Sequence, residues 1–208
     1  MLSHRMQYNK VQHGTFQPNQ FRGISQRSTE DVGVFLTHLI RAGWAKKLKA
    51  SMVAFDITQF FPSLNHEVLM VVIQKAGFPL ALGNFFCSYL TGWKNMYKWD
   101  DSVSGLFTAD IGVGQGSGLS LVLLGLYIGP VLKLFSFEPI SKEVQLLSYV
   151  NDGMVLTQSM HLAQNLPKLT AAYGIIYRLL MALGLVLEHD KLEVYHFSRL
   201  RGELYPPH

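Results

Sequence analysis

Two acidic residues in this sequence stand where short apolar segments end. Asp56 follows the apolar run at 52–55, and Asp152 closes the tetrapeptide Tyr149-Val150-Asn151-Asp152, which lies between two further apolar runs. The second pattern predicts a β-hairpin with polar side chains at its tip. Two strand-borne carboxylates brought side by side could hold a divalent metal ion and handle phosphates. Asn151 is unexpected, because a metal-holding tip would carry a carboxylate at that position.

The composition favours a folded chain with a basic first segment. Hydrophobic residues make up 49% of the 208 residues and charged residues 15%, which argues against disorder of the whole chain. Residues 1–50 hold eight Lys or Arg and two Asp or Glu, a net charge of +6, and the remainder holds ten against twelve, a net of −2. This asymmetry suits an anionic polymer partner, although an ordinary solvated basic face has the same composition.

Cysteine content and hydropathy argue against two other kinds of protein. Cys87 is the single cysteine, so we expect no disulfide framework and no Cys/His zinc site, and its apolar neighbours predict a buried thiol. The uncharged stretch 111–132 is interrupted by glycine, serine and glutamine, and its continuously apolar part, 119–129, is too short to cross a bilayer. We therefore expect no membrane partner. Without a clear targeting signal, an intracellular location, the nucleus included, is the working expectation.

Helical and strand periodicities alternate along the chain. Residues 1–27 show no strong period and are expected to be extended or loop-rich, and Ser28 with Asp31 predicts the N-cap of a helix over about 29–46. The later elements are expected as a buried strand (50–57), two helices (65–77 and 79–90), two strands (93–99 and 106–111), an apolar helix (117–134), a hairpin (145–150 and 153–158), a helix (160–183) and a final hairpin (185–188 and 192–197). This order predicts a single α+β domain, compatible with a ferredoxin-like antiparallel sheet with helices on one face.

Five groups of residues occur in an order that resembles a known family. They are Gln20-Phe21-Arg22-Gly23 with Arg27-Ser28-Thr29, Phe55-Asp56-Ile57 before Phe60-Phe61-Pro62-Ser63, Gly114-Gln115-Gly116-Ser117 before Leu119-Ser120, the tetrapeptide 149–152, and Leu183-Gly184-Leu185 with Asp190-Lys191 and Glu193. Each is weak alone, but the ordered set resembles the reverse transcriptases of non-LTR (LINE-type) retrotransposons. The segment 184–199 resembles the fungal copies in particular. The resemblance covers about residues 10–200.

The resemblance implies a catalytic role for several residues. Asp56, the backbone carbonyl of Ile57 and Asp152 would bind two Mg²⁺ ions, and Asn151 occupies the position of the family's other tip aspartate. Lys191 matches a late lysine that would protonate the pyrophosphate leaving group. These residues would support two-metal nucleotidyl transfer, in which oxygen ligands hold the ions and the ions stabilise the charged phosphates.

Other matching residues are implied to bind the substrates. Phe61 stands at the aromatic gate that packs under the nucleotide sugar, and Gln115 and Gly116 would line the nucleotide pocket. Arg22 and Arg27 would touch the template or its phosphates. The implied partners are an RNA template, a DNA primer and deoxynucleoside triphosphates.

The chain departs from the family at the tip and in the pocket loop. Asn151 replaces an aspartate, and a neutral amide is a poor magnesium ligand. Gly114 and Gly118 stand where the family favours proline, which leaves the loop less preorganised. Set against the family, residues 1–208 form one domain fragment, with partial fingers over about 1–50, the palm and remaining fingers over about 51–200, and no thumb. We therefore expect an impaired RNA-directed DNA polymerase, with a non-catalytic relic or a nucleic-acid-binding module as the alternative.

Overall fold

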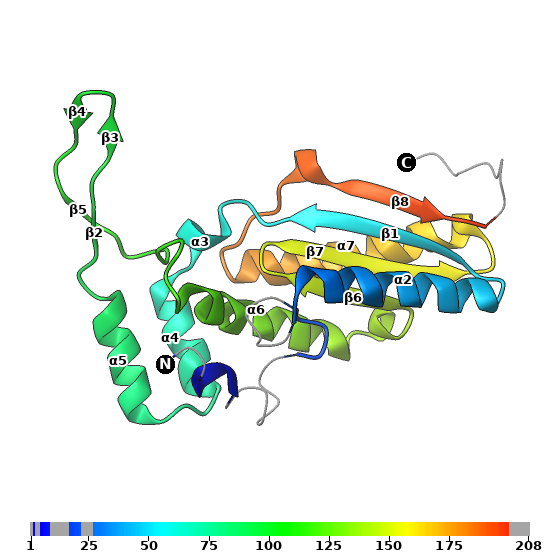
Figure 1. Cartoon of the computed structure of the whole chain (residues 1–208), viewed down its shortest axis with the longest axis horizontal. Coiled ribbons are helices and arrows are strands. Elements are labelled where there is room, and N and C mark those ends of the chain that lie inside the picture. The colour runs from blue at the N-terminus through cyan, green and yellow to red at the C-terminus, as the bar shows by residue number, and fades with distance from the viewer. Residues whose placement is uncertain (1, 3–4, 9–16, 22–26, 200–208) are drawn as a thin grey trace.

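A four-stranded antiparallel sheet forms the centre of the computed structural model, which describes residues 2, 5–8, 17–21 and 27–199 (Figure 1). The strands are β1 (Lys49–Asp56), β6 (Val144–Tyr149), β7 (Asp152–Ser159) and β8 (Glu193–Phe197). Their order in the sheet is β6-β7-β1-β8, and each neighbouring pair is antiparallel. The central pair is therefore β1, which ends at Asp56, and β7, which begins at Asp152, with a further strand on each side.

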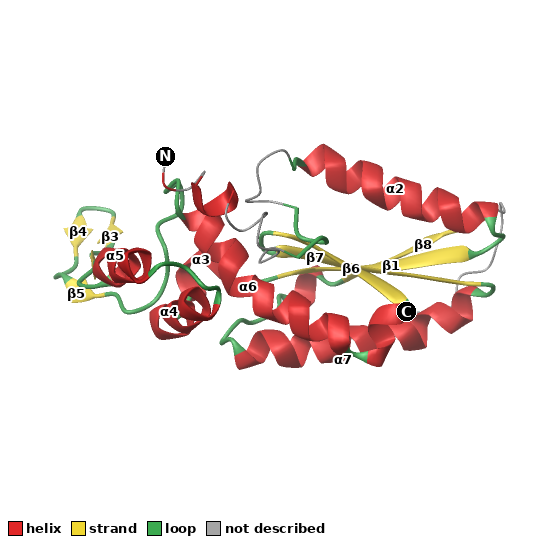
Figure 2. Ribbon diagram, turned by 90° about the horizontal axis from the view of Figure 1, so that it is seen from below, coloured by secondary structure: helices red, strands yellow, loops and turns green. Residues whose placement is uncertain are grey.

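Helices cover both faces of the sheet (Figure 2). The three long ones are α2 (Thr29–Ala45), α6 (Ser120–Phe137) and α7 (Asn165–Ala182). On the α6 and α7 side, Val53 and Phe55 of β1 join the main core. On the α2 side, Ile40 packs in a second cluster with Met52. Successive strand side chains point to opposite faces, so β1 contributes to both cores. The predicted α+β fold is confirmed, and α2 adds a helix on the second face of the sheet.

Three short helices lead from the sheet to a protruding arm (Figure 1): α3 (Phe60–Ser63), α4 (His66–Lys75) and α5 (Leu80–Leu90). The arm consists of β2 (Lys94–Asn95), β3 (Lys98–Trp99), β4 (Ser102–Val103) and β5 (Phe107–Thr108). The 3₁₀ helices η1 (Pro139–Lys142), η2 (Leu162–Gln164) and η3 (His189–Lys191) lie in other connections, next to β6, α7 and β8. In the arm, β2 pairs with β5 and β3 with β4, in ladders of two residue pairs each. The expected strands 93–99 and 106–111 are thus reduced to short pieces around a turn at Asp100, whose φ is 49°.

Local capping signals in the sequence agree with the helix starts. The Ser28 hydroxyl and the Asp31 carboxylate form the predicted capping box at the start of α2. The Asn65 side chain accepts a hydrogen bond from the backbone N–H of Val68 at 3.0 Å and caps α4. Pro167 lies in the first turn of α7, as expected. These ends follow from neighbouring residues alone, so they are predictable without tertiary information.

Two local expectations are wrong. Residues 5–8 are helical rather than extended, and Met6 is buried in the main core. Cys87 is exposed rather than buried, because the core-facing residues of α5 are Phe86 and Leu90. A cysteine one position away from Phe86 on a helix points about 100° away from it, so it faces solvent.

Helix α6 is apolar around most of its circumference. By length and composition it is the one helix among the described residues that could cross a membrane, and 67% of its 18-residue span is buried within the fold. Val122, Leu123 and Tyr127 have no exposed surface. Such burial is typical of a core helix, which is hydrophobic on all sides because protein surrounds it.

Candidate active site

Asp56 and Asp152 lie opposite each other on the two central strands. Their Cα atoms are register partners at the ends of β1 and β7, and the backbone N–H of Ile57 donates to the carbonyl of Asn151 at 2.9 Å. Tyr149 pairs with Asp152 across the predicted hairpin, which leaves a two-residue turn. The first turn residue, Val150, has a φ of 60°, an uncommon conformation for a β-branched side chain. The backbone therefore accepts strain at the point where the polar tip is formed.

Gly153 allows the central strands to pack tightly beside this tip. A Cβ atom at Gly153 would lie within 3.0 Å of three ring atoms of Phe55, its register partner on β1. The Phe55 ring also makes an edge contact with Tyr173 of α7, with 6.1 Å between ring centroids. The glycine therefore makes room for an aromatic side chain that joins the two strands to the helix layer.

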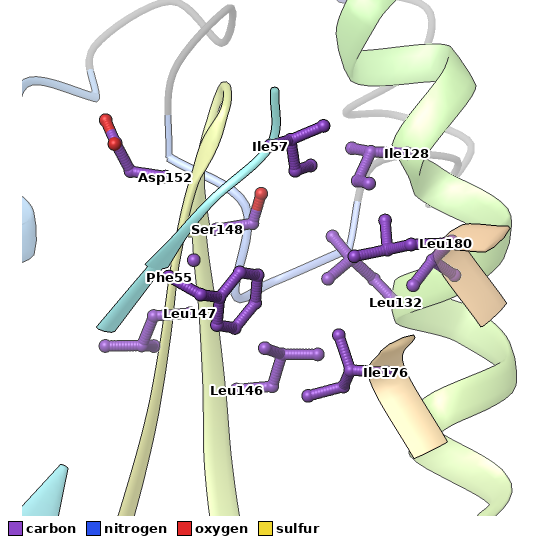
Figure 3. Close-up of a pocket in the computed structure, with 12 residues that line it drawn as sticks. Phe55, Ile57, Ile128, Leu132, Leu146, Leu147, Ser148, Asp152, Ile176 and Leu180 are labelled. Atoms are coloured by element: carbon purple, nitrogen blue, oxygen red, sulfur yellow. The ribbon is translucent and has the colours of Figure 1, made fainter. Parts of the chain in front are cut away.

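The space beneath the tip is a core void and not a ligand site. Figure 3 shows the cavity, with apolar side chains such as Leu132, Ile176 and Leu180 around it and the Asp152 carboxylate directed away from them. Its volume is about 20 Å³, which is room for one water molecule at most.

The Asp56 carboxylate is held by two different donors. The Asn151 side-chain Nδ2 donates to Oδ1 at 2.7 Å, and the Lys191 Nζ donates to Oδ2 at 2.8 Å. The Asp56 side chain is 17% exposed and that of Lys191 is 62% exposed. Asp56, Asn151, Asp152 and Lys191 are called the carboxylate end below. The structure brings all four residues together from three separate parts of the chain.

These contacts shift the pKa values of the pair in opposite directions. Burial raises the pKa of Asp56, but the hydrogen bonds from Lys191 and Asn151 and the charge of Lys191 outweigh it, so the pKa of Asp56 lies below its usual value. The hydrogen bond to Asp56 and the charge of that carboxylate raise the pKa of Lys191. Both groups are therefore charged at neutral pH.

Lys191 reaches the site because the expected final hairpin does not form. The segment 185–188 pairs with the end of β1 rather than with β8: Leu187 bridges Ile57, and the N–H of Glu188 donates to the carbonyl of Asp56 at 2.9 Å. Beyond it, η3 interrupts the edge and β8 resumes the pairing with β1. Both pieces thus extend one sheet edge, and the 3₁₀ turn between them carries Lys191. Sequence alternation identified the extended pieces but not their common partner.

Glu188 belongs to this region and was missed in the sequence. Its carboxylate accepts a hydrogen bond from the Thr58 hydroxyl at 3.3 Å, and its charge contributes to the raised pKa of Lys191. Glu188 caps the η3 turn, and its backbone carbonyl accepts a hydrogen bond from the Lys191 N–H at 3.2 Å. Residues three apart on a 3₁₀ turn lie on the same side, but the sequence was expected to form a hairpin here and not such a turn. Its position directly before His189-Asp190-Lys191 was the available signal.

The loop at 114–118, called the glycine loop below, is held next to Phe61 through the backbone. The N–H of Val113 donates to the carbonyl of Phe61 at 2.9 Å, and the Ser120 hydroxyl donates to the carbonyl of Gly114 at 2.6 Å. Phe61 is half-buried against the main core. Gln115 and Gly116 are exposed, and the φ of Gly116 is +96°. The residues assigned to the nucleotide pocket are thus neighbours, with the loop tip open to solvent.

The arginines assigned to the template are only partly described. Arg22 lies outside the described residues. Arg27 donates to the carbonyl of Pro18 at 2.9 Å and to that of Gln20, and its guanidinium lies 5.7 Å from the centroid of the Phe21 ring. Arg27 therefore ties segment 17–21 to the start of α2, and contact with a template stays a prediction.

The donor set fits magnesium only in part. Asp56 and Asp152 supply oxygen ligands of the kind that magnesium prefers. Within the described part of the chain, however, no group of three or more His, Cys, Asp or Glu side chains could hold a metal ion. Asn151 turns its amide NH₂ group toward Asp56, and Lys191 holds the other carboxylate oxygen. An NH₂ group and an ammonium cannot bind a cation, so the arrangement does not fit a bridging pair of ions.

The antiparallel sheet thus brings two carboxylates together at one end, with Asn151 and Lys191 beside them. A family model described as reverse transcriptase (RNA-dependent DNA polymerase) matches residues 2–202. The chain therefore belongs to the reverse transcriptase family. No curated protein matches its sequence.

Solved structures of telomerase are similar in fold. Apo telomerase from Candida tropicalis, truncated from its C-terminal domain, has a TM-score of 0.70 at 16% identity over 97% of this chain and 40% of that chain. Telomerase from Candida albicans, in complex with a TWJ fragment of telomeric RNA, has a TM-score of 0.63 at 12% identity over 97% of this chain and 34% of that one. The chain thus spans well under half the length of these structures, and the likeness concerns the fold.

Proposed function

We propose that this chain is the fingers-and-palm part of the RNA-directed DNA polymerase of a non-LTR retrotransposon, of fungal type, with activity lowered by Asn151. Family membership supports the reaction class. The opposed positions of Asp56 and Asp152 support the same site that the motifs indicate. The substrates would be an RNA template, a DNA primer and deoxynucleoside triphosphates. One of the similar telomerases was solved with an RNA fragment, which agrees with a nucleic acid partner.

The hydrogen bond from Asn151 to Asp56 is the main observation that supports the proposal of lowered activity. In the family, two Mg²⁺ ions supply the charge that nucleotidyl transfer requires. Here the amide gives Asp56 a neutral donor in place of a further negative ligand. Removing one preorganised electrostatic contact from an active site costs about 3–4 kcal/mol of transition-state stabilisation, or roughly two to three decades of rate. The remaining groups would orient the substrates without restoring that stabilisation.

Primer extension on an RNA template with a DNA primer and magnesium tests this proposal. Asn151→Asp should raise the extension rate by about 10²–10³-fold over the natural chain. The double variant Asn151→Asp with Asp56→Asn is the matched control, because it has the same total charge as the natural chain and lacks the first aspartate. A gain that survives in the double variant would contradict the assigned role of Asp56.

A non-catalytic nucleic-acid-binding module is the second candidate. The observation that favours it is the pairing of both Asp56 carboxylate oxygens, one with Asn151 and the other with Lys191. This pairing would stabilise the site without a metal ion. The basic residues 1–50 would then bind nucleic acid by neutralising phosphates. Such binding weakens steeply with salt and needs no magnesium. If Asn151→Asp stays inactive while it binds the primer-template in a salt-dependent manner, this second function is the correct one.

A further inference from the structure

The position of Lys191 points to a site that carries its own cation. We propose that the Lys191 ammonium is the resident cation of the carboxylate end and takes the place of a divalent ion on Asp56, so that the natural chain folds and keeps this site ordered without metal. The inference rests on the proposed function only in taking Asp56 as the residue that would otherwise bind the metal.

The geometry gives Lys191 a defined place rather than a chance contact. Its Nζ lies 2.8 Å from Oδ2 of Asp56, whose side chain is mostly covered. The η3 turn that carries Lys191 is fixed on both sides by sheet contacts, through the Leu187–Ile57 bridge before it and the pairing of β8 with β1 after it. Because β1 carries Asp56 itself, the same edge pairing positions both partners.

The surrounding charges favour a cation at this place. Asp152 and Glu188 both act on the ammonium in addition to Asp56, and all three carboxylates raise the pKa of Lys191. Glu188 is in turn oriented by the Thr58 hydroxyl. The Lys191 ammonium thus contacts Asp56 directly and lies in the field of two further carboxylates, which is the charge arrangement that a bound cation would otherwise have.

Asn151 completes the arrangement on the other oxygen of Asp56. Its amide donates to Oδ1 while Lys191 donates to Oδ2, so each carboxylate oxygen has a donor. An aspartate at position 151 would replace this donor with a further negative charge beside Asp56 and would raise the demand for an external cation. Asn151 and Lys191 therefore act together, one by removing a charge and the other by supplying the opposite one.

A divalent ion and the ammonium compete for the same oxygen. An ion bound to Oδ2 would lie close to Nζ, and two cations at such a separation repel each other. Metal binding at Asp56 must therefore displace Lys191. It follows that removing the Lys191 charge should increase metal affinity, whereas a merely structural ion pair would lose stability without that gain.

Thermal melts and Mn²⁺ binding test the proposal on the whole chain. The variants are Lys191→Gln, which removes the charge, and Lys191→Arg, which keeps it. Lys168→Gln is the matched control, because Lys168 forms an ion pair of similar length, 2.9 Å, with Glu143 on the far part of the sheet. Each protein is melted in EDTA and in magnesium, and Mn²⁺ affinity is measured by titration calorimetry.

Magnesium should not change the melting temperature of the natural chain, and it should not change that of Lys191→Arg. Lys191→Gln should melt about 2–4 °C lower in EDTA, should regain that loss in magnesium, and should bind Mn²⁺ at least about tenfold more tightly than the natural chain. Lys168→Gln should show no response to magnesium. A natural chain that magnesium stabilises as much as it stabilises Lys191→Gln would overturn the proposal, and so would an unchanged Mn²⁺ affinity in Lys191→Gln.

This outcome is separate from that of the polymerase assay. Melting and Mn²⁺ binding report on the cation at Asp56 and need no substrate. If primer extension fails in all variants but Lys191→Gln gains Mn²⁺ affinity, the resident-cation proposal stands and the polymerase proposal fails. The opposite pattern, with extension by Asn151→Asp and no metal effect of Lys191→Gln, would leave the polymerase proposal intact and contradict the resident cation.

Discussion

The carboxylate end and the glycine loop hold residues assigned to one site, yet they are fixed in different ways. At the carboxylate end, side chains from three chain segments contact one another, and Asp56 is held by both Asn151 and Lys191. In the glycine loop the anchors are the backbone of Val113 and the carbonyl of Gly114, and the tip is exposed. Substitutions at the first region should change packing and charge, whereas those at the second should change backbone freedom.

The largest expected effect on stability is directly beside the carboxylate end, at Gly153, which lies against the Phe55 ring. In Gly153→Ala the added Cβ overlaps the ring, so the ring or the strand must shift, at a cost of about 3 kcal/mol in the free energy of unfolding. Urea unfolding measures this value. Phe55→Leu should recover part of the loss in the double variant, because it removes the overlapping ring; a single variant as stable as the natural chain would refute this packing argument.

Gly116 should show the next largest effect, through conformation rather than packing. Its φ of +96° is a backbone region that side chains with a Cβ rarely adopt, and the space around it is open. Gly116→Ala should therefore cost about 1–2 kcal/mol by strain alone, again in urea unfolding. Gly116→Asn, which tolerates positive φ better, should cost less than Gly116→Ala, and equal costs would show that strain is not the cause.

Asn151→Ala should lower stability at the carboxylate end in a pH-dependent manner, unlike the substitutions in the glycine loop. Asp56 has a folded-state pKa below its ordinary value of 3.8, so its contribution to stability is present above that value and disappears as pH falls through the lower folded-state pKa. Losing the Asn151 hydrogen bond should raise the folded-state pKa of Asp56 and cost about 1 kcal/mol at neutral pH.

Acid titration of the circular dichroism signal measures the effect of Asn151→Ala. The variant loses part of the downward pKa shift of Asp56. The difference in the free energy of unfolding between variant and natural chain should therefore be largest at neutral pH, and it should vanish below the folded-state pKa of Asp56. A difference of constant size down to the acid limit would mean that Asn151 acts by packing and not through the charge of Asp56.

The smallest expected effect is a gain in the glycine loop. Gly118 has no neighbour within 4 Å of an added Cβ and no positive φ. Gly118→Ala should raise the free energy of unfolding by about 0.5 kcal/mol, because it restricts the unfolded chain more than the folded one. It also serves as the glycine control for Gly153→Ala. A clear loss of stability in Gly118→Ala would show that the loop needs its glycine for reasons beyond conformational freedom.

Helix ends and strand alternation were predictable because they depend on nearby residues. Ser28 with Asp31, Asn65, and the two runs around the tip at 149–152 each contain their own local signal, and the structure agrees with all of them. Cys87 was misplaced for the opposite reason. An apolar run such as the one around Cys87 contains both buried and exposed positions when it forms a helix. Only the packing of α5 shows that Phe86 is buried and Cys87 is exposed.

The sequence by itself determined the order of the elements, the two aspartates at strand ends and the substitution at Asn151, because residue type, period and spacing are properties of a single segment. Only the tertiary structure decided that segment 185–197 pairs with β1, that Lys191 thereby reaches Asp56, and that Glu188 lies beside them. Strand partners are chosen by long-range packing and by the burial of each face, which no local pattern contains. The identity of the group that neutralises Asp56 is therefore a property of the fold.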